Sequence, residues 1–303
     1  PVVDAHLHVW DLSVSDYSWL TPEHGPLHST FAPSTAKAQL DAAGVSGAVL
    51  VQAEDSLRDT EYLLAVADEH DWVAGVVGWI PLDDPTAAER ELSRWCEHPV
   101  FRGVRHLVHD DPREDFLALS AVRQSLGLVA ERGLTFDVPD AWPRHLDATV
   151  DLARSMPQLE IVLDHLGKPP RDREDQARWA ASLRALADCP NTVAKVSGLQ
   201  APGAPFTAEA LRSIWDTGWE FFGADRLMFG SDWPMTTVHG GYPRSLAVAT
   251  TLADALSDAE RAALFAGTAQ RVYGLTSAPA RTNSSPDLLT GSSSRPYTSE
   301  IDF

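Results

Sequence analysis

Cysteine and positive charge are both scarce in this chain of 303 residues. It has two cysteines, and 24 lysines and arginines against 43 aspartates and glutamates. Cys96 and Cys189 lack the spacing of a metal-binding or redox motif, and free thiols indicate a reducing compartment. The formal net charge of -19 makes nucleic acid and anionic membranes poor partners.

Long hydrophobic runs are absent as well. No stretch is apolar enough to span a membrane, and residues 1–20 do not have the pattern of a signal peptide, so we expect a cytoplasmic protein. The hydrophobic fraction of 44% is ordinary for a globular chain that buries its own core. An acidic surface suits a neutral substrate and an anionic product, whereas an anionic substrate would need a local cationic pocket.

Eight short apolar segments recur along the chain, and their carboxyl ends lie mostly one βαβ unit apart. This rhythm predicts a (β/α)8 TIM-like barrel. An open doubly wound sheet is disfavoured, because no glycine-rich phosphate loop follows the first strand. The predicted strands cover residues 2–6, 47–52, 73–80, 101–108, 134–138, 160–165, 192–196 and 226–230.

The segments between these strands have sequence patterns typical of helices. Ser34 is predicted to cap a helix over 35–43 that stops at Gly44. Residues 9–33 form a long aromatic-rich loop, either a lid or a small satellite core. The barrel domain is predicted to cover 1–275, and a Ser- and Pro-rich tail to cover 276–303. Further predicted helices cover 113–132, 143–155, 173–187 and 208–222.

A His-X-His pair, His6 and His8, lies at the end of the first predicted strand. Alternate residues of a strand point the same way, so both imidazoles and Asp4 are predicted to share one side. Two imidazoles on one face suit a divalent metal ion or an electrophilic carbonyl oxygen. Two histidines at a strand end can also be ordinary polar residues, so partners from other strands decide between these interpretations.

Several other predicted strands also end in polar groups, where functional side chains of a (β/α)8 barrel lie. His165 and Asp232 each follow an apolar run and precede Gly or Pro, in turns that bring a side chain to the barrel mouth. The other strand-end residues have structural alternatives, such as an ion pair of Lys195 with Asp164 or Asp232. These residues are Gln52, Trp79, Arg105, His106, Asp137 and Lys195.

With His-X-His on the first strand, a histidine on the sixth and an aspartate on the eighth, the chain resembles the amidohydrolase superfamily. Longer motifs resemble its branch of sugar-lactone hydrolases, which includes L-fuconolactonases, L-rhamnonolactonases, sulfomuconolactonases and 2-pyrone-4,6-dicarboxylate lactonases. The resemblance covers residues 2–275. The motifs are Val-Trp-Asp-Leu at 9–12, Phe-Arg-Gly-Val-Arg-His at 101–106, Leu-Asp-His-Leu-Gly-Lys-Pro at 163–169, Lys-Val-Ser-Gly-Leu at 195–199, Phe-Gly-Ser-Asp-Trp-Pro at 229–234 and Ala-Gln-Arg-Val-Tyr-Gly-Leu at 269–275.

The resemblance implies catalytic roles for four matched residues. Asp232 matches the general base that activates water. The histidines His6, His8 and His165 match groups that polarise a lactone carbonyl or hold a metal ion. Binuclear members bridge two metals through Lys or Glu of a middle strand, and 101–108 and 134–138 carry neither. The resemblance therefore leaves either no required cofactor or one divalent ion, zinc being expected, bound by His6, His8, His165 and Asp232.

Substrate-binding roles follow from the same resemblance and from the aromatic content. Arg105 and His106 match an orienting site on the fourth strand, and Lys195 matches a position where a cation meets substrate oxygen. Tryptophans offer apolar faces for a sugar ring. The predicted substrate-binding residues are Arg105, His106, Lys195, Trp10, Trp79, Gln52 and Trp233.

These observations predict a hydrolase of carbohydrate catabolism that opens a sugar-acid lactone, with a homo-oligomer left open. One alternative is a zinc-dependent decarboxylase of a related amidohydrolase branch. Another is a hydrolase of an aromatic-derived lactone, a muconolactone or a pyrone. A dicarboxylated lactone would require several cations, for which Arg105 and Lys195 are the obvious candidates. A non-catalytic barrel is disfavoured by Asp232.

Overall fold

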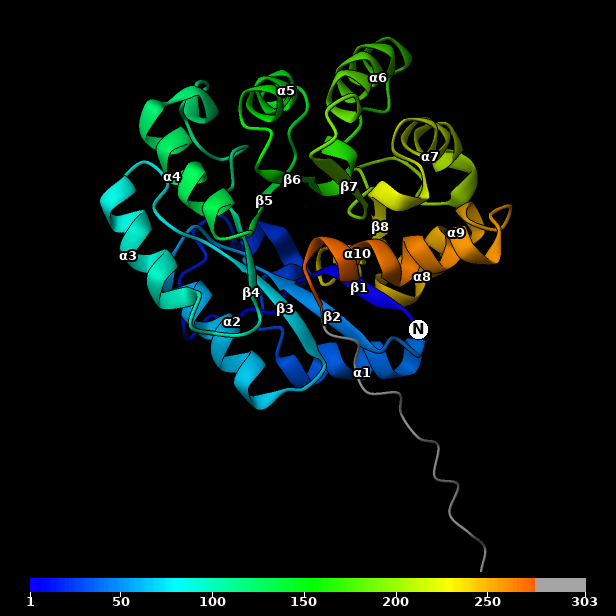
Figure 1. Cartoon of the computed structure of the whole chain (residues 1–303). Coiled ribbons are helices and arrows are strands. Elements are labelled where there is room, and N and C mark those ends of the chain that lie inside the picture. The colour runs from blue at the N-terminus through cyan, green and yellow to red at the C-terminus, as the bar shows by residue number, and fades with distance from the viewer. Residues whose placement is uncertain (276–303) are drawn as a thin grey trace, which may run out of the picture.

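A closed ring of parallel strands surrounded by helices forms the molecule (Figure 1). The computed structural model describes residues 1–275, and the predicted tail over 276–303 lies outside the described residues. The strands follow one another around the sheet in chain order, from β1 to β8. The predicted (β/α)8 barrel is therefore confirmed.

All eight predicted strands are present. The largest difference is at the fourth, predicted to continue to residue 108 but ending at Arg105. The chain leaves the sheet there because the backbone N–H of Leu107 donates to the Asp55 carboxylate, 3.0 Å away. The strands are β1 Val3–Leu7, β2 Gly47–Val51, β3 Val73–Gly78, β4 Phe101–Arg105, β5 Thr135–Val138, β6 Glu160–Leu163, β7 Thr192–Val196 and β8 Leu227–Phe229.

The helices cover the outside of the strands, and two predicted details were wrong. Ala32, not Ser34, occupies the cap position of α1, because the helix begins at Pro33, whose fixed φ suits a first helical residue. The predicted helix over 113–132 is split into a 3-10 turn, Phe116–Ala118, and α4. The helices are α1 Pro33–Ala43, α2 Leu57–Glu69, α3 Pro85–Trp95, α4 Ser120–Glu131, α5 Leu146–Ser155, α6 Arg173–Ala187, α7 Ala208–Phe222, α8 Gly241–Leu252, α9 Asp258–Ala262 and α10 Thr268–Val272.

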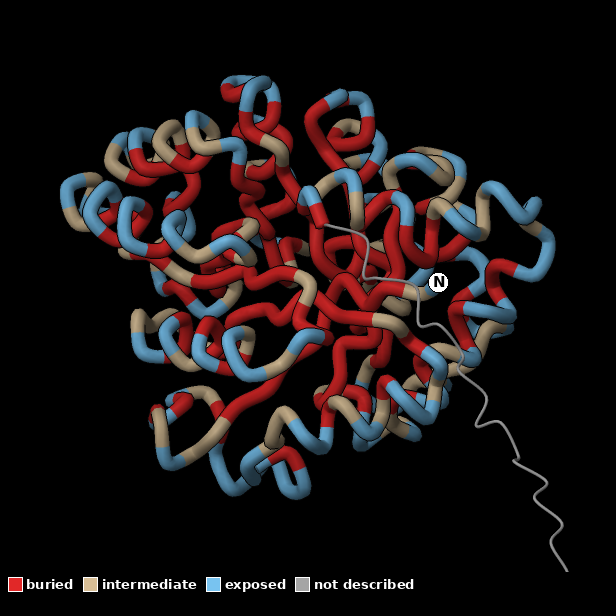
Figure 2. Tube along the Cα trace, turned by 60° about the horizontal axis from the view of Figure 1, so that its bottom comes forward, coloured by how far each residue is buried: buried red, intermediate tan, exposed pale blue. Residues whose placement is uncertain are grey.

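Burial follows this layered arrangement. Figure 2 shows buried residues along the strands and on the inward sides of the helices, with exposed residues on the outer helix faces. A second, smaller apolar cluster joins strand side chains such as Val49 and Met228 to Tyr273 and Leu275. No helix within residues 1–275 has the length and apolar character needed to cross a bilayer.

The first and last strands meet through the segments that carry candidate site residues. The backbone N–H of His8 donates to the Trp233 carbonyl, and that of Asp232 donates to the His6 carbonyl, both at 2.8 Å. An isolated parallel bridge joins Leu7 to Trp233. Closure of the barrel therefore places the His-X-His segment directly beside Asp232.

Asp4 strengthens this seam from the outer side. Its Oδ1 atom accepts hydrogen bonds from the backbone N–H groups of His6, at 3.0 Å, and Ser231, at 2.9 Å. Burial raises the pKa of Asp4 to about 6, against the opposing hydrogen bonds. The prediction that Asp4 faces the same side as His6 was wrong, because the pairing register shifts between Asp4 and Leu7.

Candidate active site

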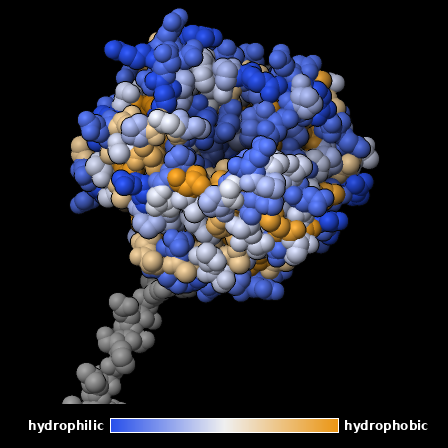
Figure 3. Space-filling model, turned by 180° about the vertical axis from the view of Figure 1, so that it is seen from behind, coloured by the Kyte–Doolittle hydropathy of each residue, from blue (hydrophilic) through white to orange (hydrophobic). Residues whose placement is uncertain are grey.

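A cavity of about 610 Å³ opens where the strands end, and five predicted site residues border it: His8, Trp10, Arg105, His165 and Asp232. Figure 3 shows the molecule hollowed on the face seen from behind, with mainly hydrophilic residues around the hollow. The location agrees with the rule that (β/α)8 enzymes work at the carboxyl ends of their strands.

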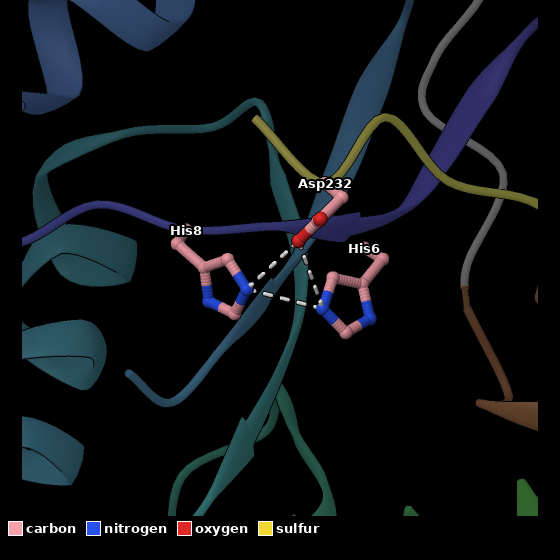
Figure 4. Close-up of side chains that lie close together, drawn as sticks. All are labelled: His6, His8 and Asp232. Carbon is pink, nitrogen blue, oxygen red and sulfur yellow. Dashed lines mark hydrogen bonds and ion pairs between the residues drawn. The ribbon is translucent and has the colours of Figure 1, made fainter. Parts of the chain in front are cut away.

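Three side chains converge at the bottom of this cavity (Figure 4). His6 Nε2 and His8 Nε2 are 3.1 Å apart. The Oδ1 atom of Asp232 lies 3.5 Å from His8 Nε2 and 3.8 Å from His6 Nε2. The first and eighth strands therefore bring together the residues that the sequence predicted as partners.

The donor atoms of this cluster suit one divalent cation. His8 Nδ1 donates to the Val51 carbonyl at 2.8 Å, which leaves the lone pair of Nε2 directed at the cluster. One point lies about 2.0 Å from His6 Nε2, His8 Nε2 and Asp232 Oδ1 together, which matches zinc–nitrogen and zinc–oxygen bond lengths. The site therefore fits one ion with three protein ligands.

His165 lies next to this group but is not part of it. A candidate ligand set of the described residues joins His6, His8 and Asp232, and a second one places His165 with His6 and Asp164. The His165 ring centroid is 4.6 Å from that of His6, and its Nδ1 atom is 2.8 Å from Ser197 Oγ. The Ser197 hydroxyl, which directly follows β7, therefore helps to fix the orientation of the His165 ring.

Both His165 and Asp232 have left-handed backbone conformations, with φ of 57° and 54°. Such values are unfavourable for side chains with a Cβ atom and occur where the surrounding structure enforces them. The chain turns away from β6 and β8 at these residues, so each side chain points to the cavity instead of entering the next helix.

Asp232 is held as a carboxylate. Burial alone would raise its pKa, but the surrounding imidazoles, His165 first and then His8 and His6, hold the pKa of Asp232 below its usual range. The Gln200 side-chain amide also donates to Asp232 Oδ2 at 2.8 Å. Burial lowers the pKa of His6 and of His165, so both imidazoles are neutral at neutral pH.

A buried ion network lies beneath the imidazoles. Lys195 Nζ is 2.7 Å from Asp137 Oδ2 and 2.9 Å from Asp164 Oδ1, and all three side chains are fully buried. Arg105 Nη1 is 3.1 Å from Asp164 Oδ2. Although burial opposes ionisation, Lys195 first and then His6 and Arg105 hold the pKa of Asp164 well below its usual range.

This network decides between the two interpretations of Lys195. The residue does not border the cavity, and its ammonium group pairs with Asp164, as in the structural alternative. The predicted contact between Lys195 and a substrate oxygen does not agree with this placement. Asp164 lies 3.3 Å from His6 Nδ1 and therefore links the buried cations to the candidate metal ligands.

Comparison with known proteins identifies the family. The family model described as Amidohydrolase matches residues 3–275. The chain belongs to the amidohydrolase family. It is 33% identical to L-fucono-1,5-lactonase of Burkholderia ambifaria over 245 residues, 79% of this chain and 82% of the relative. It is also 33% identical to L-fucono-1,5-lactonase of Burkholderia multivorans over 286 residues, 90% of this chain and 96% of the relative.

A solved structure supports the same relationship. An amidohydrolase of Burkholderia multivorans, crystallised with bound zinc, superimposes with a TM-score of 0.82 at 32% sequence identity. The match covers 91% of this chain and 99% of that protein. The family and the barrel predicted from the sequence are thereby confirmed.

Four further predicted substrate-binding residues of this amidohydrolase lie behind the cavity wall. Trp79 Nε1 donates to His106 Nδ1 at 3.1 Å, and the His106 ring stacks on Phe116 with centroids 4.1 Å apart. Gln52 donates to the Arg105 carbonyl at 3.2 Å. Trp233 packs edge-on against another aromatic ring. These side chains support the wall, whereas the predicted Trp10 and Arg105 border the cavity itself.

The structure adds cavity residues that sequence reasoning missed. Most of them lie on loops, where neither strand spacing nor helix periodicity places a side chain. His24 belongs to the aromatic loop noted in the sequence, and Gln200 directly follows the Lys-Val-Ser-Gly-Leu motif, so both had a weak local signal. The additional residues include Trp19, His24, His109, Asp110, Asp140, Lys168 and Gln200.

The loop over 9–33 forms the small satellite core that was one of its two predicted roles. Tyr17, Leu20 and Leu27 form a small buried cluster with Trp10 and Ala53. Trp10 also borders the cavity, together with neighbouring loop residues. The loop is therefore a satellite core that supplies part of the cavity wall.

The Tyr17–Asp59 contact that anchors this loop predicts a pH dependence. Tyr17 Oη donates to Asp59 Oδ1 at 2.8 Å, and burial raises the Asp59 pKa to about 7. Native Asp59 binds its proton more tightly than unfolded Asp59, so its stabilising contribution is lost as pH rises from about 4 to about 7. Asp59→Asn should therefore gain stability relative to wild type across that range, by up to about 4 kcal/mol.

Urea unfolding at pH 4.5 and 7.5 measures this difference, with exposed Asp71→Asn as the control for loss of one charge. A stability difference between Asp59→Asn and wild type that is independent of pH would contradict the prediction.

The close approach of Gly198 to the His165 ring predicts a steric effect of substitution on activity. A Cβ atom at this position would lie 2.3 Å from His165 Nδ1, and its φ is +54°. Gly198→Ala should displace the His165 ring and lower kcat/KM by about 100-fold. Gly203→Ala is the matched control, because Gly203 also has a positive φ, +70°, but has open space around its Cβ position. Equal losses in the two variants, measured by steady-state kinetics, would disprove the steric explanation.

Proposed function

We propose that this amidohydrolase hydrolyses the ester bond of an uncharged sugar-acid lactone. The observation that carries the proposal is the convergence of the Asp232 carboxylate with the His6 and His8 imidazoles at a cavity that has an indole in its wall. Its two L-fucono-1,5-lactonase relatives support the choice of a sugar lactone.

In the proposed mechanism, Asp232 removes a proton from water as the water oxygen attacks the lactone carbonyl carbon. The carbonyl π electrons move to its oxygen, and His165 and its neighbours stabilise this oxyanion by hydrogen bonding. When the tetrahedral intermediate collapses, the bond to the ring oxygen breaks, and Asp232 returns the proton to that oxygen. The product is an open hydroxy acid.

The candidate metal ligands indicate what a bound ion would contribute to this reaction. We propose that His6, His8 and Asp232 hold at most one divalent ion, with zinc as the expected element. When bound, the ion would polarise the lactone carbonyl as a Lewis acid. His8 keeps its Nε2 lone pair available through the hydrogen bond from Nδ1 to Val51, and Asp164 orients His6 from behind.

The charges near the cavity favour an uncharged substrate. The cations expected to meet a dicarboxylated lactone are already paired, Arg105 with Asp164 and Lys195 with Asp137 and Asp164. Lys168 is the lysine that borders the cavity among the described residues. Its Nζ donates to the Gly198 carbonyl at 2.8 Å. Carboxylates of Asp110, Asp140 and Asp232 border the same space. An anionic lactone would face net repulsion there.

Acid release from purified protein tests the proposal. L-fucono-, L-rhamnono- and D-galactono-lactones are added separately, and the base consumed at constant pH is recorded, together with the zinc content of the protein. We expect ring opening well above the spontaneous rate for at least one of them. No acid release from any lactone, or CO₂ release from a dihydroxybenzoate, would overturn the proposal and favour a decarboxylase.

A further inference from the structure

Asp140 has an unusual position in the cavity wall. It follows β5 by two residues, has a φ of +43° and borders the cavity. Aspartate tolerates the left-handed region better than most residues, usually because its carboxylate accepts a hydrogen bond from a nearby backbone N–H. Here the side chain of Asp140 makes no hydrogen bond or ion pair with any residue of the described range 1–275.

The usual structural roles of an aspartate in such a turn do not apply to Asp140. The next helix, α5, begins at Leu146, and its N-cap residue is His145, so Asp140 does not cap it. The other cavity carboxylates are engaged: Asp232 with Gln200, and Asp110 with His109 at 3.7 Å. A left-handed backbone that presents an unpaired carboxylate to a cavity points to contact with a ligand.

Asp140 also borders the same cavity as His165 and Asp232. Burial lowers the pKa of His165 and is the largest effect on it. Among the charges that raise this pKa, Asp232 contributes most and Asp140 comes second. Asp140 follows β5, the strand beside β6, and therefore borders the cavity on the same side as His165.

We propose that Asp140 binds hydroxyl groups of the lactone ring and thereby selects hydroxylated, uncharged lactones over anionic ones. This inference rests on the proposed lactonase function. A carboxylate has two oxygens with lone pairs and accepts from two neighbouring hydroxyl groups at once, as charge-assisted hydrogen bonds. The same negative charge repels a lactone that carries a free carboxylate. Asp140 is thus a specificity residue, separate from the groups that perform the chemistry.

The test compares three lactones in wild type, Asp140→Ala and Asp140→Asn. The probes are the best hydroxylated lactone from the acid-release assay, δ-valerolactone, which has no hydroxyl groups, and D-glucaro-1,4-lactone, which carries a carboxylate. Asp140→Ala should raise KM for the hydroxylated lactone at least tenfold with little change in kcat, and change kcat/KM for δ-valerolactone less than twofold. Asp140→Asn should lose less affinity and reduce the discrimination against D-glucaro-1,4-lactone. If δ-valerolactone reacts too slowly, its Ki against the hydroxylated lactone replaces kcat/KM.

Exposed Asp151→Asn, on α5, controls for the loss of one negative charge away from the cavity. Equal losses on δ-valerolactone and the hydroxylated lactone in Asp140→Ala, or a KM within twofold of wild type, would overturn the role of Asp140. A wild-type enzyme that opens no lactone at all would instead overturn the proposed function, and this inference with it.

Discussion

Asp232→Asn should lower kcat by about 10²–10⁴-fold, the usual contribution of a general base. Asn has the same shape but cannot accept a proton from water at neutral pH. The cavity and the barrel seam should persist, because the seam at this position uses the backbone N–H of residue 232, which donates to the His6 carbonyl at 2.8 Å. Steady-state kinetics with the best lactone substrate measure the effect.

Two controls separate loss of the base from loss of structure. The melting temperature of Asp232→Asn should stay within a few degrees of wild type, and its KM should change much less than its kcat. Asp151→Asn provides the same change in charge on an exposed surface of α5. A kcat of Asp232→Asn within threefold of wild type would exclude Asp232 as the base.

Lys195→Met should cost about 3–5 kcal/mol of unfolding free energy, the range found when one partner of a buried ion pair is removed. Methionine fills a similar volume, so the effect comes from charge rather than from a cavity. Without the ammonium group, Asp137 and Asp164 remain buried, with a tyrosine hydroxyl on Asp137 and the Arg105 guanidinium on Asp164. Activity should fall as well, because Asp164 positions His6.

Chemical denaturation of three variants tests this explanation. Lys195→Met/Asp137→Asn should regain part of the lost stability, since Asp137, the carboxylate left without a cation, has been neutralised. Lys37→Met, which removes the same side chain from an exposed ion pair with Asp41, should cost less than about 1 kcal/mol. Similar losses for Lys195→Met and Lys37→Met would refute a role for buried charge.

The sequence was sufficient to predict the barrel and the grouping of His6, His8 and Asp232. β-branched runs at regular spacing located the strands, and polar residues at or after the ends of these runs identified His6, His8, His165 and Asp232, which lie close together in the structure.

Sequence reasoning failed where the outcome depended on which way a side chain points. Lys195 lies within β7 and could face substrate or a neighbouring strand; only packing shows that its charge meets Asp137 and Asp164. For Asp4, strict alternation predicted the wrong face, because a register shift interrupts β1. Loop residues such as Asp140 have no periodic pattern that could have placed them.

The seam between β1 and β8 determines when this enzyme can first work during its synthesis. Asp232 follows its partner His6 by more than two hundred residues, so it leaves the ribosome long after His6. A nascent chain that has not reached Asp232 lacks the proposed general base, one of the candidate cation ligands and the closure through Asp4 and Ser231. Such chains should therefore be inactive, and activity that appears during translation would report barrel closure.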